Sequence, residues 1–135
     1  MSQYVPKHFK IYELVNKSTY AKYGEKAWWF LDDRLLKIID TIREDLGPMT
    51  VNSWYWGGPF QWRGLRTSEY YQGKPSQSQH SFGRAVDFDV KGMTADEVRL
   101  HIRNNPEYGI TAIENDVNWV HIDIRNVDPL MEFNP

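Results

Sequence analysis

Two segments of the chain alternate between apolar and polar residues, and this alternation constrains the fold more than any other feature. The apolar positions, which would share one face, are Val86, Phe88 and Val90 in residues 84–90 and Val120, Ile122 and Ile124 in residues 119–125. A period of two is typical of β-strands with one buried face. The opposite faces carry Asp87 in the first segment and His121, Asp123 and Arg125 in the second. If the two strands are neighbours in an antiparallel sheet, a carboxylate and an imidazole meet on the face that the core does not use.

The other segments predict helices and further strands. We expect helices over residues 27–46 and 94–104 and strands over residues 50–55, 84–90, 110–114 and 119–125, with residues 1–26 as loop that contains short elements. The first helix follows from a Leu and Ile stripe that ends at Gly47 and Pro48, and the second from the capping-box spacing of Thr94 and Glu97. A long irregular stretch runs from residue 57 to about residue 79. This order of elements predicts an α+β fold over residues 1–135 as a single domain, an antiparallel sheet with helices packed on one face.

The composition excludes several classes of protein. The 135 residues contain no cysteine, which rules out disulfides, thiolate zinc fingers and cysteine nucleophiles. A formal net charge of −2 without a basic block argues against nucleic acid as a partner. No apolar run approaches the ~18 residues of a membrane span. Residues 1–15 lack the apolar segment of a signal peptide, so we expect synthesis in the cytoplasm. Nothing in the chain demands more than a monomer.

Three potential metal ligands stand on or beside the two alternating strands. His80 lies just before the first strand, Asp87 lies within it, and His121 lies within the second. Two imidazoles and a carboxylate are the number and kind of protein ligands that a catalytic zinc takes. From spacing alone, each of these residues could equally be an ordinary surface or hydrogen-bonded group.

The sequence motifs around these residues resemble those of a known group of proteins. Ser78, His80, Gly83, Ala85 and Asp87 match the pattern S-x-H-x-x-G-x-A-x-D, and Trp119-Val120-His121-Ile122-Asp123 matches the later strand. Together they resemble the zinc peptidases that include D-alanyl-D-alanine carboxypeptidases, bacteriophage L-alanyl-D-glutamate endopeptidases and the hedgehog signalling domain. The resemblance is dense over residues 76–125. It implies one zinc ion held by His80, Asp87 and His121, on the sheet face away from the helices.

A hydrolytic zinc site also needs a general base, and three carboxylates are candidates. We expect Glu114 to serve, because pairing with Trp119 across a four-residue turn would put it on the face of His121. Asp116, at the tip of the turn, and Asp123, downstream of His121, are the alternatives. Some relatives have Glu or Asp three residues before the histidine, where this chain has Asn118. Asp123 and Asp89 could instead orient the ligands.

Substrate contacts are predicted for four residues. The family places an arginine in a Ser-Gly-Tyr-Arg segment, which reads Asn52-Ser53-Trp54-Tyr55 here. Arg63 and Arg66 are the nearest replacements, because arginine binds carboxylates through two parallel hydrogen bonds; Arg84 is a weaker choice. Ser78 is expected to bind the substrate backbone, and Trp119 to wall the cleft. The aromatic run Trp54-Tyr55-Trp56 could stack on sugar rings or pack the long loop over the sheet.

The leading functional hypothesis is a zinc metallopeptidase that hydrolyses peptide bonds in the stem peptides of bacterial peptidoglycan, as a carboxypeptidase or an endopeptidase. The resemblance to phage enzymes suggests an endolysin or virion lysin that acts on the cell wall after release from the cytoplasm. The alternative is a non-catalytic zinc-containing binding module on the same scaffold, as the hedgehog domain illustrates.

Overall fold

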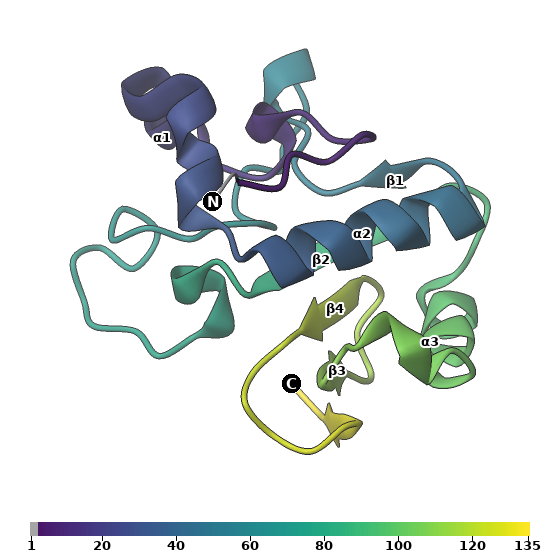
Figure 1. The fold of residues 1–135 in the computed structure, drawn as a ribbon. Coiled ribbons are helices and arrows are strands. Elements are labelled where there is room, and N and C mark those ends of the chain that lie inside the picture. The colour runs from purple at the N-terminus through teal and green to yellow at the C-terminus, as the bar shows by residue number, and fades with distance from the viewer. Residues whose placement is uncertain (1–2) are drawn as a thin grey trace.

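The computed structural model describes residues 3–135 and contains three α-helices and five strands (Figure 1). In chain order they are α1 (Lys17–Tyr23), α2 (Asp33–Leu46), β1 (Met49–Thr50), β2 (Ala85–Val90), α3 (Ala95–Arg103), β3 (Ala112–Glu114), β4 (Val120–Asp123) and β5 (Met131–Phe133). Short 3-10 turns join them; two matter below, η2 (Gly24–Phe30) and η4 (Gln79–Phe82). None of the described helices is long and apolar enough to cross a membrane.

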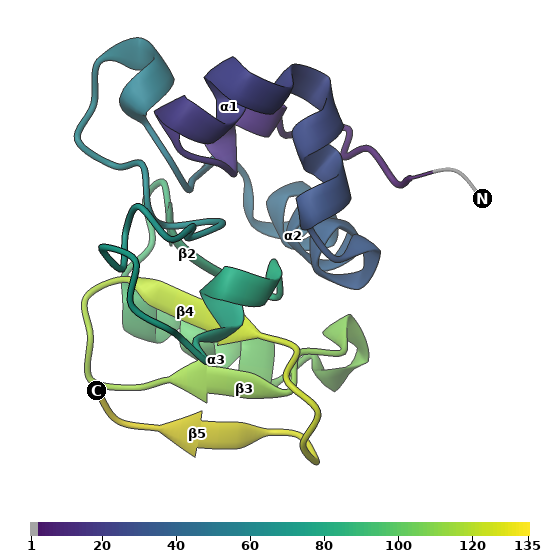
Figure 2. The same ribbon diagram turned by 90° about the vertical axis from the view of Figure 1, so that its left-hand side faces the viewer.

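The strands form one sheet in the order β1-β2-β4-β3-β5. Figure 2 looks onto this sheet, with β4, β3 and β5 one below another, α3 behind them and η4 in front. The pairs β1–β2, β2–β4 and β3–β4 are antiparallel, whereas β3 and β5 are parallel. The predicted α+β class and the predicted pairing of the two alternating strands are therefore confirmed. The sequence did not predict the parallel edge strand β5.

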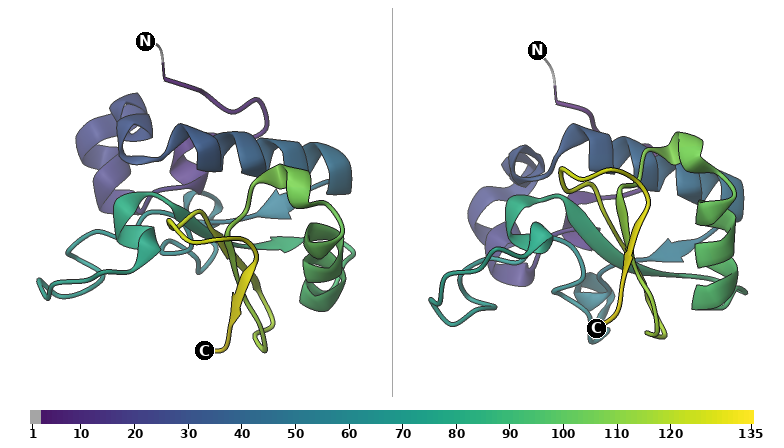
Figure 3. Two further views of the ribbon diagram at one scale, coloured as in Figure 1. Left: turned by 60° about the horizontal axis from the view of Figure 1, so that its bottom comes forward. Right: turned by 90° about the horizontal axis from the view of Figure 1, so that it is seen from below.

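The apolar faces of β2 and β4 are buried with the helices. Val86, Phe88 and Ile122 belong to one core with Ile39 of α2 and Val98 of α3. Figure 3 shows α2 along the top of both views and α3 at their right-hand side. The prediction that all the helices pack on one face of the sheet remains a prediction. The core residues hold β2 and β4 in a fixed register, and this register positions the polar residues on the opposite face.

The main helix is shorter than the sequence pattern predicts. Residues 24–30 form the turn η2, Leu31 is extended, and α2 begins only at Asp33. The reason is local: the side chain of Asp32 accepts a hydrogen bond from the Arg34 backbone N–H at 2.8 Å and so caps the helix. An aspartate at this position stabilises a helix start better than it stabilises a helix interior.

Replacing Asp32 by alanine is expected to lower the free energy of unfolding by about 1 kcal/mol at pH 7. The hydrogen bonds from Arg34 hold the pKa of Asp32 below its usual range. Because the folded-state pKa lies below the unfolded one, the carboxylate's contribution is complete above about pH 4 and is lost as the pH falls through the folded pKa. Urea unfolding at pH 7 and near pH 2.5 measures this difference. Asp32→Asn, which keeps the capping oxygen, is the control and should lose less at pH 7.

The strand predicted over residues 50–55 is also shorter than expected, because the chain leaves the sheet after Thr50. The buried Asn52 redirects it: its side-chain amide donates to Val15 O at 3.1 Å and its Oδ1 accepts from Arg63 N at 2.9 Å. The aromatic run that follows forms a 3-10 turn, in which Tyr55 stacks on Tyr12 at 3.8 Å between ring centroids. This run packs against the N-terminal segment. A later part of the same connection between β1 and β2 extends to the left in Figures 1 and 3.

Candidate metal centre

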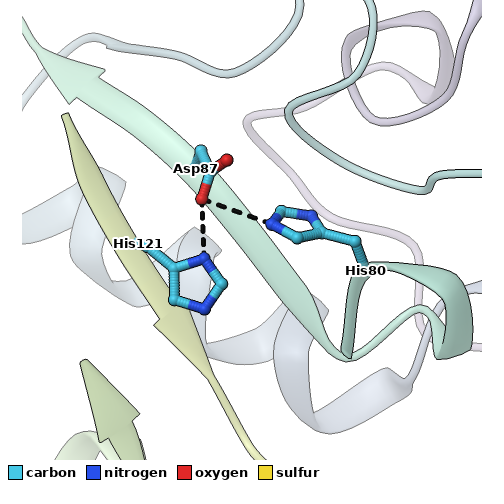
Figure 4. Close-up of side chains that lie close together, drawn as sticks. All are labelled: His80, Asp87 and His121. Carbon is cyan, nitrogen blue, oxygen red and sulfur yellow. Dashed lines mark hydrogen bonds and ion pairs between the residues drawn. The ribbon is translucent and has the colours of Figure 1, made fainter. Parts of the chain in front are cut away.

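Three predicted ligands converge on the polar face of the sheet. Asp87 in β2 and His121 in β4 are direct partners in the antiparallel ladder. His80 comes from η4, the turn that leads into β2. Figure 4 shows both imidazole rings directed at the carboxylate of Asp87. One ligand atom from each residue lies within 4.8 Å of the other two, and all three residues are buried.

The distances suit a single divalent ion. Asp87 Oδ1 lies 2.7 Å from His121 Nδ1 and 3.3 Å from His80 Nε2. Ligand atoms about 2.1 Å from a tetrahedral zinc stand roughly 3.4 Å apart. Small side-chain shifts would therefore bring these three atoms to zinc-binding distances, and the donor set of two nitrogens and one oxygen is one that zinc accepts.

The second nitrogen of each histidine ring has its own partner. His80 Nδ1–H donates to Gly64 O at 2.9 Å, which leaves Nε2 free to bind a cation. His121 Nε2–H donates to Asp123 Oδ2 at 2.8 Å, and Nδ1 faces Asp87 Oδ1 at 2.7 Å, on the side where a cation would bind. Acceptors behind the ligating histidines are typical of zinc sites because they fix the tautomer and the ring orientation. Asp123 thus orients His121, whereas Asp89 pairs with Arg63 at 2.7 Å.

The electrostatics of the centre also favour a cation. Burial acts to raise the pKa of Asp87, but hydrogen bonds to His121 and His80 outweigh it and hold this pKa well below its usual range. Burial acts to lower the pKa of His121, but Asp123 and Asp87 raise it to about 9. Two buried carboxylates therefore hold one positive charge on the ring between them. A divalent cation bound by Asp87 and His121 would supply positive charge at the same place, and its binding would release the Nδ1 proton of His121.

The turn η4 places His80. Ser78 caps the turn by accepting a hydrogen bond from His80 N at 3.3 Å. Gly83 ends it in the left-handed region, with φ of +69°, and its carbonyl accepts from Asp32 N at 2.9 Å. The backbone carbonyl of Phe30 lies where a side chain at position 83 would begin. Both the dihedral angle and the surroundings of position 83 therefore require glycine.

Gly83→Ala is expected to destabilise the fold by more than about 2 kcal/mol and to weaken zinc binding, because the new methyl group would displace η4. Gly73→Ala is the matched control: Gly73 has a similar φ of +77° but open space around it. The strain of the left-handed dihedral alone should cost Gly73→Ala about 1 kcal/mol. Urea unfolding and zinc titration of both variants measure the difference, and equal losses of stability would contradict the proposed clash.

The three ligands open onto a cleft of about 360 Å³. Its lining also includes Arg66, Gln77, Ser78, Gln79, Glu114, Trp119, Arg125 and Phe133. Of the three candidate bases, Glu114 alone lines this cleft. Asp123 is fully buried and bound to His121 and Arg125. Asp116 is exposed and, with Asn118, lines a separate cavity of about 650 Å³ beside α3.

The register that places Glu114 differs from the predicted one. The predicted turn would pair Glu114 with Trp119, but the ladder pairs Ala112 with Asp123 and Ile113 with Ile122. Continuing it by one residue brings Glu114 opposite His121. A shift of two residues leaves a strand on the same face, so Glu114 still lies on the side of His121, beside it instead of diagonal to it.

The predicted substrate-binding residues fall into two groups. Ser78, Arg66 and Trp119 line the cleft. Arg66 donates from Nη2 to Asp87 Oδ2 at 3.2 Å. Arg63 lies outside the cleft lining, paired with Asp89, and Arg84 points towards Asp32 at 4.0 Å.

Four residues of the cleft were not predicted from the sequence: Gln77, Gln79, Arg125 and Phe133. The alternation of residues 119–125 already put Arg125 on the face of His121, so a signal was present. Phe133 belongs to β5, where its ring contacts that of His121 at 5.6 Å between centroids. Its three-residue strand carried no comparable pattern.

Comparisons with known proteins identify the family. A sequence model described as peptidase M15 matches residues 7–123, which is most of the chain and includes all three ligands. Searches of curated proteins and of solved structures gave no match. M15 peptidases are zinc-dependent, so the family supports a zinc metallopeptidase with peptide substrates. The predicted resemblance is thereby confirmed, and the chain belongs to the peptidase M15 family.

Proposed function

We propose that the protein is a zinc-dependent peptidase that hydrolyses peptide bonds in the stem peptides of bacterial peptidoglycan. The observation that carries this proposal is the presence of Glu114 in the same cleft as His80, Asp87 and His121. The peptidoglycan substrate, and a setting in phage lysis or in the virion, are supported by the motif resemblance.

One zinc ion would be held by His80 Nε2, Asp87 Oδ1 and His121 Nδ1. When bound, zinc supplies a Lewis acid that polarises a carbonyl and acidifies a water molecule. Arg66 holds the carboxylate of Asp87 in place through its second oxygen. Asp123 holds the ring of His121. These two contacts keep the ligand atoms directed at one point.

Glu114 performs the proton transfers. Its carboxylate takes a proton from the attacking water as the oxygen bonds to the scissile carbonyl carbon. As the C–N bond breaks, the same proton passes to the leaving amine. Ser78 and Trp119 line the cleft where the peptide backbone would lie, and the Arg66 guanidinium offers hydrogen bonds to a substrate carboxylate.

The direct test is hydrolysis of peptidoglycan by the purified, zinc-loaded protein. We expect free amino groups to appear with zinc, to stop appearing when a chelator removes the metal, and to return when zinc is restored. Synthetic stem peptides separate by mass the carboxypeptidase product, a released terminal residue, from an internal cut. Zinc-loaded protein that cleaves neither peptidoglycan nor any stem peptide would rule the peptidase out.

One observation favours the second candidate, a zinc-containing binding module. Asn118 stands where some relatives have an acid, and it lines the cavity beside α3, away from the metal ligands. A site that had lost its base would still bind zinc and peptides. Turnover distinguishes the two candidates, because a module would bind stem peptides without cleaving them.

A further inference from the structure

A second arginine lines the cleft, and the proposed mechanism does not use it. Arg125 lies just beyond β4, where its Nε donates to Asp123 Oδ1 at 2.7 Å and its Nη2 donates to Asp123 Oδ2. The guanidinium lies over the ring of Phe133, 4.8 Å from its centroid. Within residues 3–135, Nη1 has no hydrogen-bond partner, and the side chain is 28% exposed. One edge of the guanidinium is therefore available to a ligand.

Arg66 and Arg125 lie on the same face of the sheet but approach the metal ligands from different directions. Arg66 belongs to the loop beside β2, where Asp87 N donates to Arg63 O at 2.8 Å. Arg125 leaves the end of β4 and packs on Phe133 of β5, at the far edge of the sheet. The ligands on β2 and β4 lie between these two positions.

The cleft becomes cationic when a divalent ion is bound. Arg66 and Arg125 contribute two positive charges to the lining, and Asp87 and Glu114 contribute two negative charges. The two charges of the ion therefore remain, and the adjoining buried Asp123 offsets one of them. A cleft of this sign attracts anionic ligands. Arginines at both ends give such a ligand two separate points of attachment.

We propose that Arg125 is a second carboxylate anchor, so that the cleft selects peptides with a carboxylate on each side of the cleaved bond. This inference rests on the proposed peptidase function and narrows its substrate class. Arg66 binds one carboxylate and Arg125 binds the other through its free edge. Because guanidinium–carboxylate hydrogen bonds are charge-assisted, each anchor contributes strongly to substrate binding.

Four synthetic peptides test the anchor. They share one backbone. One peptide carries both carboxylates, two carry a single carboxylate with the other replaced by a carboxamide, and the fourth carries two carboxamides. For the unmodified protein, removing either carboxylate should raise KM roughly 10- to 100-fold. Arg125→Gln should show this rise with the full peptide and no further rise when the carboxylate bound by Arg125 is also removed. Arg84→Gln, which alters an arginine outside the cleft, should behave as the unmodified protein.

Zinc content and direct binding separate anchoring from a structural role. Arg125 also binds Asp123, so a purely structural role would lower zinc affinity and impair all four peptides equally, and this result would overturn the proposal. The proposal would also be overturned if each carboxylate-to-carboxamide replacement raised KM as much in Arg125→Gln as in the unmodified protein. Calorimetric titration of the same peptides into zinc-loaded protein gives the comparison without turnover. Peptides that bind with the expected pattern but are never cleaved would defeat the peptidase and leave the anchor supported.

Discussion

Glu114→Gln is expected to lower kcat for peptide hydrolysis by about 10²- to 10⁴-fold, while the protein still binds one zinc ion per chain. Glutamine has nearly the shape of glutamate, but its amide cannot take a proton from water and return it to the leaving amine. Since Glu114 is not one of the three ligands, zinc affinity should stay close to that of the unmodified protein. Steady-state kinetics, together with metal analysis of the same samples, measures both quantities.

Asp116→Asn is the matched control for Glu114→Gln. Asp116 belongs to the same connection between β3 and β4 but is exposed and lines the cavity beside α3. Its replacement should leave kcat within about twofold, as for a surface substitution remote from the chemistry. Should Glu114→Gln keep its activity and Asp116→Asn lose it, the base would be Asp116.

His121→Ala is expected to abolish stoichiometric zinc binding and, with it, hydrolysis. The substitution removes one of three ligands and leaves the carboxylates of Asp87 and Asp123 without the ring that lies between them. We expect zinc affinity to fall by roughly 10³-fold or more, because a ligand bond and the orientation of its neighbours are lost together. Metal analysis after dialysis should give about one zinc per chain before the substitution and none after it.

His8→Ala controls for the loss of any histidine. His8 lies 3.6 Å from Glu44, outside the cleft. Its replacement should leave zinc content and activity unchanged. Full zinc occupancy in His121→Ala would show that the ion is bound elsewhere, and the proposed centre would then be wrong.

The parts of the structure that local patterns specify were predicted well. Thr94 and Glu97 make both hydrogen bonds of the capping box that starts α3. The alternation of β2 and β4 predicted that Asp87 and His121 would meet, and they are ladder partners. In each case the information lies within a few neighbouring residues, as a period or as a capping pair.

The parts that distant contacts determine were not predicted. The apolar stripe of residues 27–46 gives no sign that the helix begins only at Asp33. Leu31 is buried like the helical residues of the stripe, although its backbone is extended. The strand β5 depends on pairing with β3, and no pattern of its three residues indicates that partner. The different positions of Arg63 and Arg66 follow from the course of the long loop, which a side-chain contact from Asn52 helps to set. Residue spacing alone does not encode such contacts.

The three ligands belong to two structural units: two of them stand on paired strands, and the third stands on a separate turn. Asp87 and His121 are tied by the strand ladder, whereas His80 stands on a turn fixed by its glycine and by the Gly64 carbonyl. An ion bound by all three would act as a crosslink that staples η4 and the preceding loop to the strands. Removing it should therefore increase amide hydrogen exchange in residues 66–83 first, while β2 and β4 keep their protection.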